Sequence, residues 1–226
     1  QEVARLVADA VEATHTETYY IDCNPIPPHK AIELDQIITS AGGCFIDASI
    51  IGAPPKEGSV PRFYASGQYA KELSVLDGMG VQICPMEGGV GRASALKMCY
   101  AALGKGTHAL YIALLAAADV LGVYTELVDE LLSTNPEAYK RMEADIPRLP
   151  VKARRWVAEM ENISVTFAQT GLPSGFHLGA AEIYRILGMT PFGDESPETL
   201  DRNRTLVQTI EAFVRCLGEK PAALAS

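Results

Sequence analysis

The sequence contains few of the patterns that hold metals or disulfides. Its five cysteines form an odd set without CxxC spacing, and its four histidines are scattered singly, without an HxxxH pair. Structural metal sites usually repeat their ligands at such short spacings. We therefore expect no metal site. Unpaired thiols of this kind also favour a reducing compartment, so we expect a cytoplasmic protein.

Positive charge and long hydrophobic runs are also scarce. The chain has 19 Lys and Arg against 28 Asp and Glu, which gives a formal net charge of −9 at pH 7. Nucleic-acid binding relies on clustered cations, so we expect no nucleic-acid partner. The longest apolar run, Ala109 to Val123, includes Asp119 and is shorter than the about 20 residues that a membrane helix needs. We therefore also expect no membrane segment.

The patterns that are present divide the chain into two parts. Up to about residue 90, strand-like runs at 18–23, 44–52, 62–67 and 81–85 alternate with helical patterns at 1–13, 28–40 and 69–79. Only helices are predicted afterwards, at 92–123, 124–133, 136–145, 150–170, 175–187 and 198–217. The sequence thus predicts an α/β domain over 1–90 and an all-α domain over 91–226. Trp156, the only tryptophan, is expected to fill the helical core.

A polar stripe on the long helix of the second part is the first candidate for a functional surface. At about 100° per residue, Lys97, Tyr100, Gly104, His108 and Tyr111 project within roughly 60° of one another. The rest of this helix consists mainly of Ala, Leu, Met and Cys. Such a stripe is either a solvated face or the wall of a cleft. In a cleft, desolvation and neighbouring groups would let the lysine exchange a proton with a substrate hydroxyl.

Four motifs, in order, resemble one known family. They are YIDCNPIPP at 20–28, FIDASIIG at 45–52, GGVGRASALKMCYAAL at 88–103 and PVKARRWVAEM at 150–160. Together they resemble the β-hydroxyacid dehydrogenase and 6-phosphogluconate dehydrogenase-like superfamily, over nearly the whole chain to about residue 188. The resemblance implies a partial Rossmann-type sheet followed by a 6-phosphogluconate dehydrogenase-like helical domain.

The resemblance also implies an activity. In this superfamily the Rossmann domain binds NAD or NADP, and the helical domain completes the cleft and forms a homodimer. A lysine of the interdomain helix acts as acid and base on the hydroxyl of a small-molecule substrate, and Lys97 matches it. Relatives carry an asparagine one helical turn beyond this lysine, where this chain has Tyr100 and Ala101 as the two candidate positions. Tyr100 is either a phenolic donor to the reacting oxygen or a side chain that only covers the lysine. His108, on the same stripe, is a candidate substrate contact.

The other candidate site residues come from the remaining motifs. Ser49, Ile51 and Gly52 lie in the segment that matches the substrate loop of the family. Ile51 replaces a serine that binds a substrate carboxylate, and Ser49 either supplies that hydroxyl or pairs within the sheet. Asn24 falls near the nicotinamide ring in relatives, or forms an Asx turn before a proline. Lys152 matches a lysine that lines the cleft in relatives, and it is either a cofactor contact, like Asn24, or a solvated cation at the start of its helix.

The last absence concerns the cofactor. The chain has no GxGxxG turn, and the resemblance implies that the glycine-rich βαβ unit is missing and that the chain is a fragment. GGVG at 88–91 lacks the full spacing and is interpreted as a hinge. The sequence therefore predicts an NAD(P)-dependent oxidoreductase, or part of one, acting on a hydroxy, carbonyl or imine substrate. The alternatives are a non-catalytic helical dimerisation remnant and, with few cations for a phosphate, a decarboxylating sugar-acid dehydrogenase.

Overall fold

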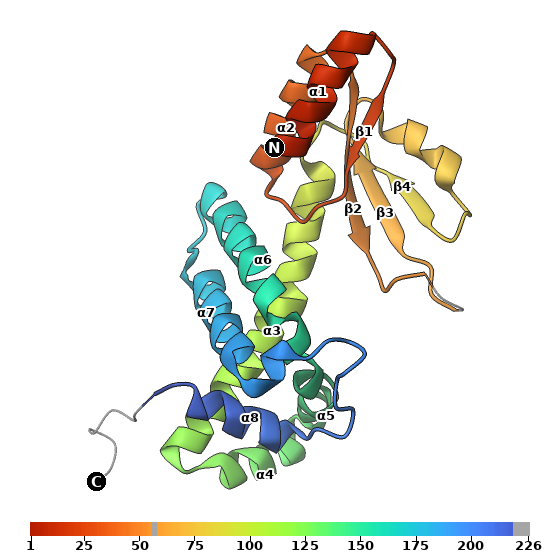
Figure 1. The fold of residues 1–226 in the computed structure, drawn as a ribbon. Coiled ribbons are helices and arrows are strands. Elements are labelled where there is room, and N and C mark those ends of the chain that lie inside the picture. The colour runs from red at the N-terminus through yellow and green to blue at the C-terminus, as the bar shows by residue number, and fades with distance from the viewer. Residues whose placement is uncertain (56–57, 219–226) are drawn as a thin grey trace. The chain divides into compact units, whose positions relative to one another are not determined.

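A computed structural model gives the fold and describes residues 1–55 and 58–218 (Figure 1). The chain divides into two compact units. The first holds residues 1–101 and 165–171, and the second holds residues 102–164 and the chain from 172 onward. The long helices α3 (Arg92–Leu121) and α6 (Pro150–Gln169) contribute to both units. The domain boundary at residues 90–91 stays a prediction.

The first unit contains a four-stranded mixed sheet, and helices alternate with its strands along the chain. Its elements are α1 (Glu2–Thr14), β1 (Tyr19–Asp22), α2 (Pro28–Ser40), β2 (Cys44–Ile51), β3 (Arg62–Ser66), the 3₁₀ helix η1 (Ala70–Leu76) and β4 (Gln82–Pro85). The strands lie in the order β1-β2-β3-β4, and β1 and β3 run parallel to β2 and β4, respectively. The central pair, β2 and β3, is antiparallel. This α/β half confirms the expected partial sheet.

Strand β2 packs apolar residues on both faces of the sheet, because alternate side chains point to opposite sides. Phe45 lies in a core cluster with residues of α1 and α2, whereas Ile46 and Ala48 lie in a cluster with Leu73 of η1. The helix predicted over 69–79 is shorter and of the 3₁₀ type, which corrects the sequence analysis. The segment ends early because Gly78, at φ 77°, turns the chain and the Asp77 carboxylate accepts the backbone N–H of Ile83 at 2.7 Å.

The second unit is helical throughout its regular elements, which confirms the all-α expectation. Besides its parts of α3 and α6 it contains α4 (Tyr124–Thr134), α5 (Pro136–Asp145), η2 (Ile146–Arg148), α7 (Gly175–Met189), η3 (Pro191–Asp194) and α8 (Leu206–Arg215). The predicted helix over 198–217 is wrong for its first part. A capping box, in which Thr205 and Gln208 exchange side-chain and backbone hydrogen bonds, begins α8 only at Leu206.

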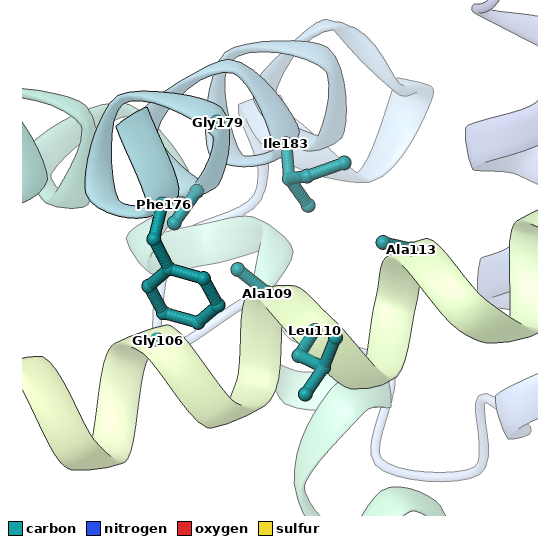
Figure 2. Close-up of a pocket in the computed structure, with 8 residues that line it drawn as sticks. Gly106, Ala109, Leu110, Ala113, Phe176, Gly179 and Ile183 are labelled. Atoms are coloured by element: carbon teal, nitrogen blue, oxygen red, sulfur yellow. The ribbon is translucent and has the colours of Figure 1, made fainter. Parts of the chain in front are cut away.

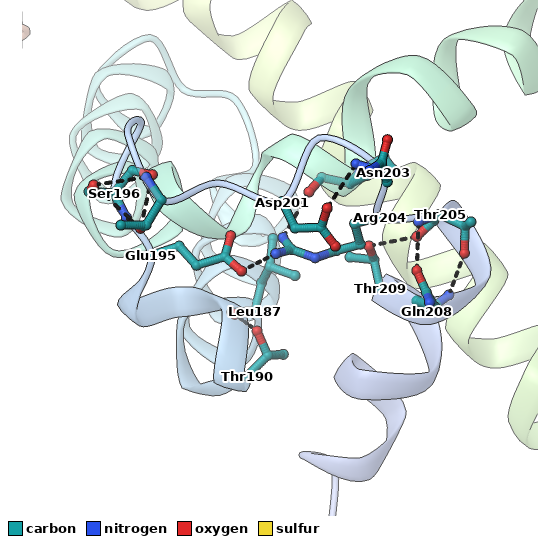
Figure 3. A network of polar contacts seen from close by, with 12 residues as sticks. Leu187, Thr190, Glu195, Ser196, Asp201, Asn203, Arg204, Thr205, Gln208 and Thr209 are labelled. Carbon is teal, nitrogen blue, oxygen red and sulfur yellow. Dashed lines mark hydrogen bonds and ion pairs between the residues drawn. The ribbon is translucent and has the colours of Figure 1, made fainter.

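A buried arginine holds the irregular segment before α8. Arg204 is 6% exposed and pairs with the carboxylate of Glu195 (Figure 3). It also donates to the backbone carbonyl of Pro147 at 3.1 Å. Its guanidinium also lies 3.8 Å from the ring centroid of Phe192. These contacts satisfy a charge that would otherwise be costly to bury, so the segment is ordered without being helical.

Helix α3 is the one helix in the described ranges that is long and apolar enough to cross a membrane. This finding rests on length and composition alone, and core helices of other proteins meet the same criterion. In α3, 44% of the apolar window is buried within the structure. The length of α3 therefore does not decide between a core helix and a membrane helix.

Candidate active site

The candidate site of the first unit lies at the carboxyl ends of β1 and β2. These strands are parallel, and Asp22 of β1 pairs in register with Asp47 of β2. Asn24 follows β1 by two residues, and Ser49 follows Asp47 by two residues, so both lie beyond this pair in the same direction. Ligands of open α/β sheets bind outside the carboxyl ends of parallel strands. The register thus places two predicted site residues at the expected edge.

Asp47 fixes the start of α3 over this edge. It is 1% exposed, and its carboxylate accepts the backbone N–H groups of Gly91 (2.9 Å) and Ser94 (3.2 Å). It also accepts the hydroxyls of Ser94 (2.7 Å) and Ser66 (2.9 Å). The N–H of Ala93 in turn donates to the Ser66 hydroxyl at 3.0 Å. A buried carboxylate at a helix N-terminus satisfies unpaired amides and the helix dipole together.

Lys97 lies on α3 shortly after this anchored start. Its Nζ donates a hydrogen bond to the backbone carbonyl of Ile50 at 2.6 Å, and the residue is partly buried. The ammonium is therefore held at the end of β2. This contact places Lys97 at the strand end that also holds Ser49 and Ile51.

The end of β2 supplies the other predicted contacts. Ser49 is 1% exposed, and its backbone pairs with Tyr64 of β3 while its hydroxyl has no hydrogen-bond partner among the described residues. Ile51 is 4% exposed and contributes only packing. Gly52 has φ 125°, and a Cβ there would lie 3.2 Å from the Cα of Pro61, so only glycine suits this turn. A buried hydroxyl without a partner is unusual and marks this end of the strand.

Three further residues near this edge differ in exposure and in hydrogen bonding: Asn24, Tyr100 and Cys23. Asn24 is exposed, and its backbone N–H and side-chain Nδ2 both donate to the Asp22 carboxylate, at 2.9 and 3.2 Å. Tyr100 lies about one turn after Lys97 on α3 and is 57% exposed. Burial, aided by the carboxylates of Asp22 and Asp47, raises the pKa of the Cys23 thiol to about 11. Cys23 therefore stays protonated at neutral pH and is excluded as a thiolate nucleophile.

The glycine-rich turn before α3 does not form a phosphate site. Gly88 and Gly91 have φ values of 104° and 98°, so the chain turns here, and the role of this segment as a hinge between domains stays a prediction. Phosphates bind helix N-termini through free backbone N–H groups. In α3, the N–H groups of Gly91, Ala93 and Ser94 already donate to Asp47 and Ser66. This helix start is thus filled by the chain's own side chains.

Two predicted residues, His108 and Lys152, belong to the second unit and share a neighbour there. The ring of His108 lies parallel to that of Trp156, with centroids 6.3 Å apart and planes inclined by 4°. The Nζ of Lys152 lies 5.9 Å from the same tryptophan ring. The structure thus groups these two residues around Trp156. Their participation in one site with Lys97 stays a prediction.

The sequence analysis did not identify the residues that hold the candidate side chains of the two units in position. Asp47 was noted only as part of a motif, and Asp145, which bonds His108 across 37 positions, was not singled out. Trp156 was expected to be core, and it is 9% exposed, but its Nε1 has no partner among the described residues. No group of three or more His, Cys, Asp or Glu side chains in the described ranges has a metal-binding arrangement.

Known proteins resemble this chain in parts. Residues 118–187 match a domain of unknown function, DUF1932. An uncharacterised 28.5 kDa protein of Methanothermus fervidus is 28% identical over 120 residues, which are 53% of this chain and 46% of that protein. The match thus spans less than half the length of this relative.

Solved structures resemble the chain over more of its length. MTH1747, a conserved protein of unknown function described as structurally similar to 3-hydroxyacid dehydrogenases, is 28% identical, with a TM-score of 0.63 over 83% of this chain and 71% of that one. Its structure decides the assignment. This chain has the fold of the β-hydroxyacid dehydrogenase-like superfamily. The resemblance inferred from the four motifs is confirmed.

Two further solved structures align with nearly the whole chain. A conserved hypothetical protein of Sinorhizobium meliloti aligns with a TM-score of 0.72 at 21% identity, over 93% of this chain and 72% of its own. The 3-hydroxyisobutyrate dehydrogenase of Mycobacterium tuberculosis, solved with L-serine, aligns with a TM-score of 0.58 at 18% identity. The alignment covers 96% of this chain and 76% of that one. At these identities the likeness concerns the fold alone.

Proposed function

We propose that the protein is an NAD(P)-dependent oxidoreductase that acts on a carbon bearing a hydroxyl, carbonyl or imine group. The observation that carries this proposal is the ammonium of Lys97, held 2.6 Å from the Ile50 carbonyl at the carboxyl edge of the sheet. The superfamily fold supports an oxidoreductase of this kind. In this proposal Lys97 is the catalytic acid and base.

Lys97 would move one proton per turnover. During oxidation of an alcohol, its neutral amine accepts the hydroxyl proton as the carbonyl forms, and in the reverse direction the ammonium returns it. The Ile50 carbonyl orients the nitrogen, because it accepts one of its N–H groups. Ser49, with its unpartnered hydroxyl, is the second polar group near the reacting oxygen in this proposal.

The site offers a contact for the reacting end of the cofactor, whereas the start of α3 offers none for its pyrophosphate. NAD(P), when bound, supplies the hydride acceptor or donor. The side-chain Oδ1 of Asn24 is an acceptor that complements an amide N–H of a nicotinamide ring. The α3 N-terminus cannot hold the pyrophosphate, since Asp47 and Ser66 occupy its amides. Either NAD or NADP is compatible with these residues.

The side chains near Lys97 support a weakly carboxylate-selective site in this proposal. Ile51 is buried and offers no hydrogen bond, and Tyr100 presents an exposed phenol on the helix face next to Lys97. Such side chains suit a carbonyl or imine substrate better than a sugar phosphate, which needs clustered cations. We propose a small-molecule substrate of this class and a cytoplasmic location.

A cofactor-coupled turnover assay tests the proposal. The protein is incubated with NADP⁺ or NAD⁺ and a panel of small hydroxy acids, alcohols and amines, and with NADPH or NADH and the matching carbonyls, while absorbance at 340 nm is followed. We expect turnover with at least one member of the panel. No turnover, together with no change of nicotinamide fluorescence on titration, would instead support a non-catalytic dimerisation remnant.

We further propose that the protein is a homodimer through its helical unit. Leu103, Leu110 and Leu121 of α3 are 73%, 51% and 55% exposed, which is high for leucine on one helix. Beside them an apolar pocket of about 240 Å³ lies between α3 and α7, where Phe176 covers Gly106 (Figure 2). We expect a dimer mass in light scattering, and Leu110→Glu is expected to shift it toward the monomer. A monodisperse wild-type monomer would contradict this proposal.

A further inference from the structure

The first unit contains a cavity of about 420 Å³ that the proposed function does not use. It opens where the parallel strands β3 and β4 end, and its lining includes Gly67, Lys71, Glu87 and Gly88. Ligands of open α/β sheets bind outside the carboxyl ends of parallel strands. The cavity therefore lies where the sheet geometry favours a ligand.

The register of the sheet separates this cavity from the candidate active site. β3 and β4 run antiparallel to β2, so their carboxyl ends lie toward the opposite end of the sheet. At Gly67 a Cβ would lie 3.8 Å from the carbonyl oxygen of Phe45, whereas Lys97 is held at the carbonyl of Ile50. These two carbonyls are five residues apart on β2, which is roughly 16 Å at the usual rise of a strand. The two places therefore bind different ligands.

The side chain of Arg92 lies against the lining of the cavity at Gly88. This glycine has φ 104°, and a Cβ there would lie 2.5 Å from Cδ and 3.1 Å from Nε of Arg92. The arginine therefore lies across a residue that lines the cavity. A larger residue at position 88 would displace it, so the glycine keeps the guanidinium at the cavity.

Two cations at the cavity have no counter-charge within the described structure. Lys71 of η1 and Arg92 of α3 are exposed, and neither forms an ion pair with a described residue. The backbone N–H groups of Gln68 and Gly88, which also line the cavity, have no acceptor among these residues. Glu87 is the one carboxylate among the described residues of the lining. Cations and free donors thus predominate, which favours an anionic ligand.

The size of the cavity and the separate origins of the two cations indicate a ligand larger than a single ion. A water molecule takes up about 30 Å³, so one small anion would leave much of this volume unfilled. Lys71 and Arg92 come from different elements, so together they suit two anionic groups of one molecule. Apolar surface for the methylene groups between these anions comes from Ala70, Pro85 and Met86. The planar guanidinium matches a carboxylate in two parallel hydrogen bonds.

We propose that this cavity binds an aliphatic dicarboxylate, with one carboxylate on Arg92 and the other on Lys71. The ligand is separate from the molecule that would react at Lys97, because the two places lie toward opposite ends of the sheet. The inference uses contacts within the first unit alone. It does not rest on the role proposed for Lys97.

Isothermal titration calorimetry with glutarate tests the proposal, and pentanoate is the matched probe in which a methyl group replaces one carboxylate. We expect saturable binding of glutarate with a dissociation constant of about 1 mM or below, as two charge-assisted contacts allow. Pentanoate should bind about threefold more weakly or worse, because only one of its ends meets a cation. Inorganic phosphate should also bind more weakly than glutarate, since a single ion does not reach both cations.

Variants that remove one charge each locate the binding in this cavity. Arg92→Gln should weaken glutarate by about tenfold, as loss of a charge-assisted hydrogen bond predicts. Lys71→Gln should weaken glutarate by about threefold and leave pentanoate unchanged, because pentanoate keeps its carboxylate on Arg92. Glu87→Gln should instead strengthen the binding of both acids, because it removes a like charge from the lining.

The matched control is Arg5→Gln, which removes an exposed cation of α1 and should behave as the wild type. Far-UV circular dichroism checks that each variant is folded. If Arg92→Gln proves unfolded, Lys71→Gln provides the same test, since it changes an exposed side chain of η1.

Three results would each overturn the proposal. They are no saturable heat with glutarate up to about 20 mM, a limit set by the weak affinity expected of so small a ligand, equal affinity for glutarate and either pentanoate or phosphate, and unchanged glutarate affinity in the folded cation variants. The titration needs neither nicotinamide nor turnover. Its failure would leave the oxidoreductase proposal standing, and failure of the turnover assay would leave this one standing.

Discussion

Replacement of Lys97 by methionine is expected to lower the turnover number by about a thousandfold, the range found for loss of a general acid and base. Methionine keeps much of the length and apolar stem of lysine but cannot carry a proton. The measurement is steady-state kinetics at 340 nm with the best substrate from the turnover assay. Because the Lys97 ammonium donates a hydrogen bond to the Ile50 carbonyl, the loss of folding stability should be about 2 kcal/mol, which leaves the protein folded.

The control for this variant is Lys140→Met, which removes an exposed lysine of α5. We expect it to retain wild-type kinetics. A Lys97→Met protein that keeps most of its activity would exclude Lys97 as the proton carrier. A variant that loses activity because it is unfolded would show a lowered melting temperature, which the same samples reveal by circular dichroism.

Asp47→Ala is expected to have the largest effect on stability, a loss of about 3 kcal/mol or more, because a buried network loses its shared acceptor. The change leaves the hydroxyls of Ser66 and Ser94 and the N–H groups of Gly91 and Ser94 without their acceptor. It also removes the negative charge at the N-terminus of α3. Urea denaturation followed by circular dichroism measures the free energy of unfolding.

Two further variants make this result specific. Asp9→Ala removes an exposed carboxylate of α1 and should change the free energy of unfolding by no more than about 0.5 kcal/mol. Asp47→Asn keeps the shape but replaces one acceptor oxygen by a donor, and it should lie between alanine and wild type. Equal stabilities of Asp47→Ala and wild type would show that α3 does not depend on this cap.

Short-range sequence patterns correctly predicted many of the helices and strands. Helix α2 was predicted at its observed bounds, 28–40, because Pro28 is suited to the first helical turn and glycines follow Ser40. Strand β2 was predicted because eight mostly apolar residues precede Gly52. The helical half followed from apolar spacing in five of its six predicted helices. In each case neighbouring residues carry the information.

Two helices were predicted with the wrong bounds, because hydrogen bonds outside the helices determine where they begin or end. The segment 198–205 has a helical composition, yet Arg204 reaches Glu195 and the Pro147 carbonyl and keeps it irregular. Residues 69–79 carry helical spacing, but the bond from Ile83 to Asp77 stops the helix early. A tertiary hydrogen bond thus overrides local propensity in the first segment, and a loop hydrogen bond between positions six apart does so in the second.

In the candidate site, too, local features were predictable from the sequence and long-range contacts were not. Lys97 was found by helical periodicity and by the ALKMCYAAL motif, both of which are local. The contact of Lys97 with Ile50 and the cap by Asp47 each join residues more than 40 positions apart, and no spacing rule reveals them. Trp156 was assigned to the core from its type alone, and its buried Nε1, which has no partner among the residues that the structure describes, distinguishes it from an ordinary core residue.

Transfer of hydride to the substrate is the central claim, and an isotope measurement tests it most directly. The protein would be incubated with each 4-deuterated epimer of NADPH, and then of NADH, together with the carbonyl substrate found in the turnover assay, and the product would be analysed by mass spectrometry. We predict deuterium on the former carbonyl carbon with one of the two epimers of a cofactor. Product formation without deuterium from any of the four, or no product at all, would contradict the assignment of this chain as an NAD(P)-dependent oxidoreductase.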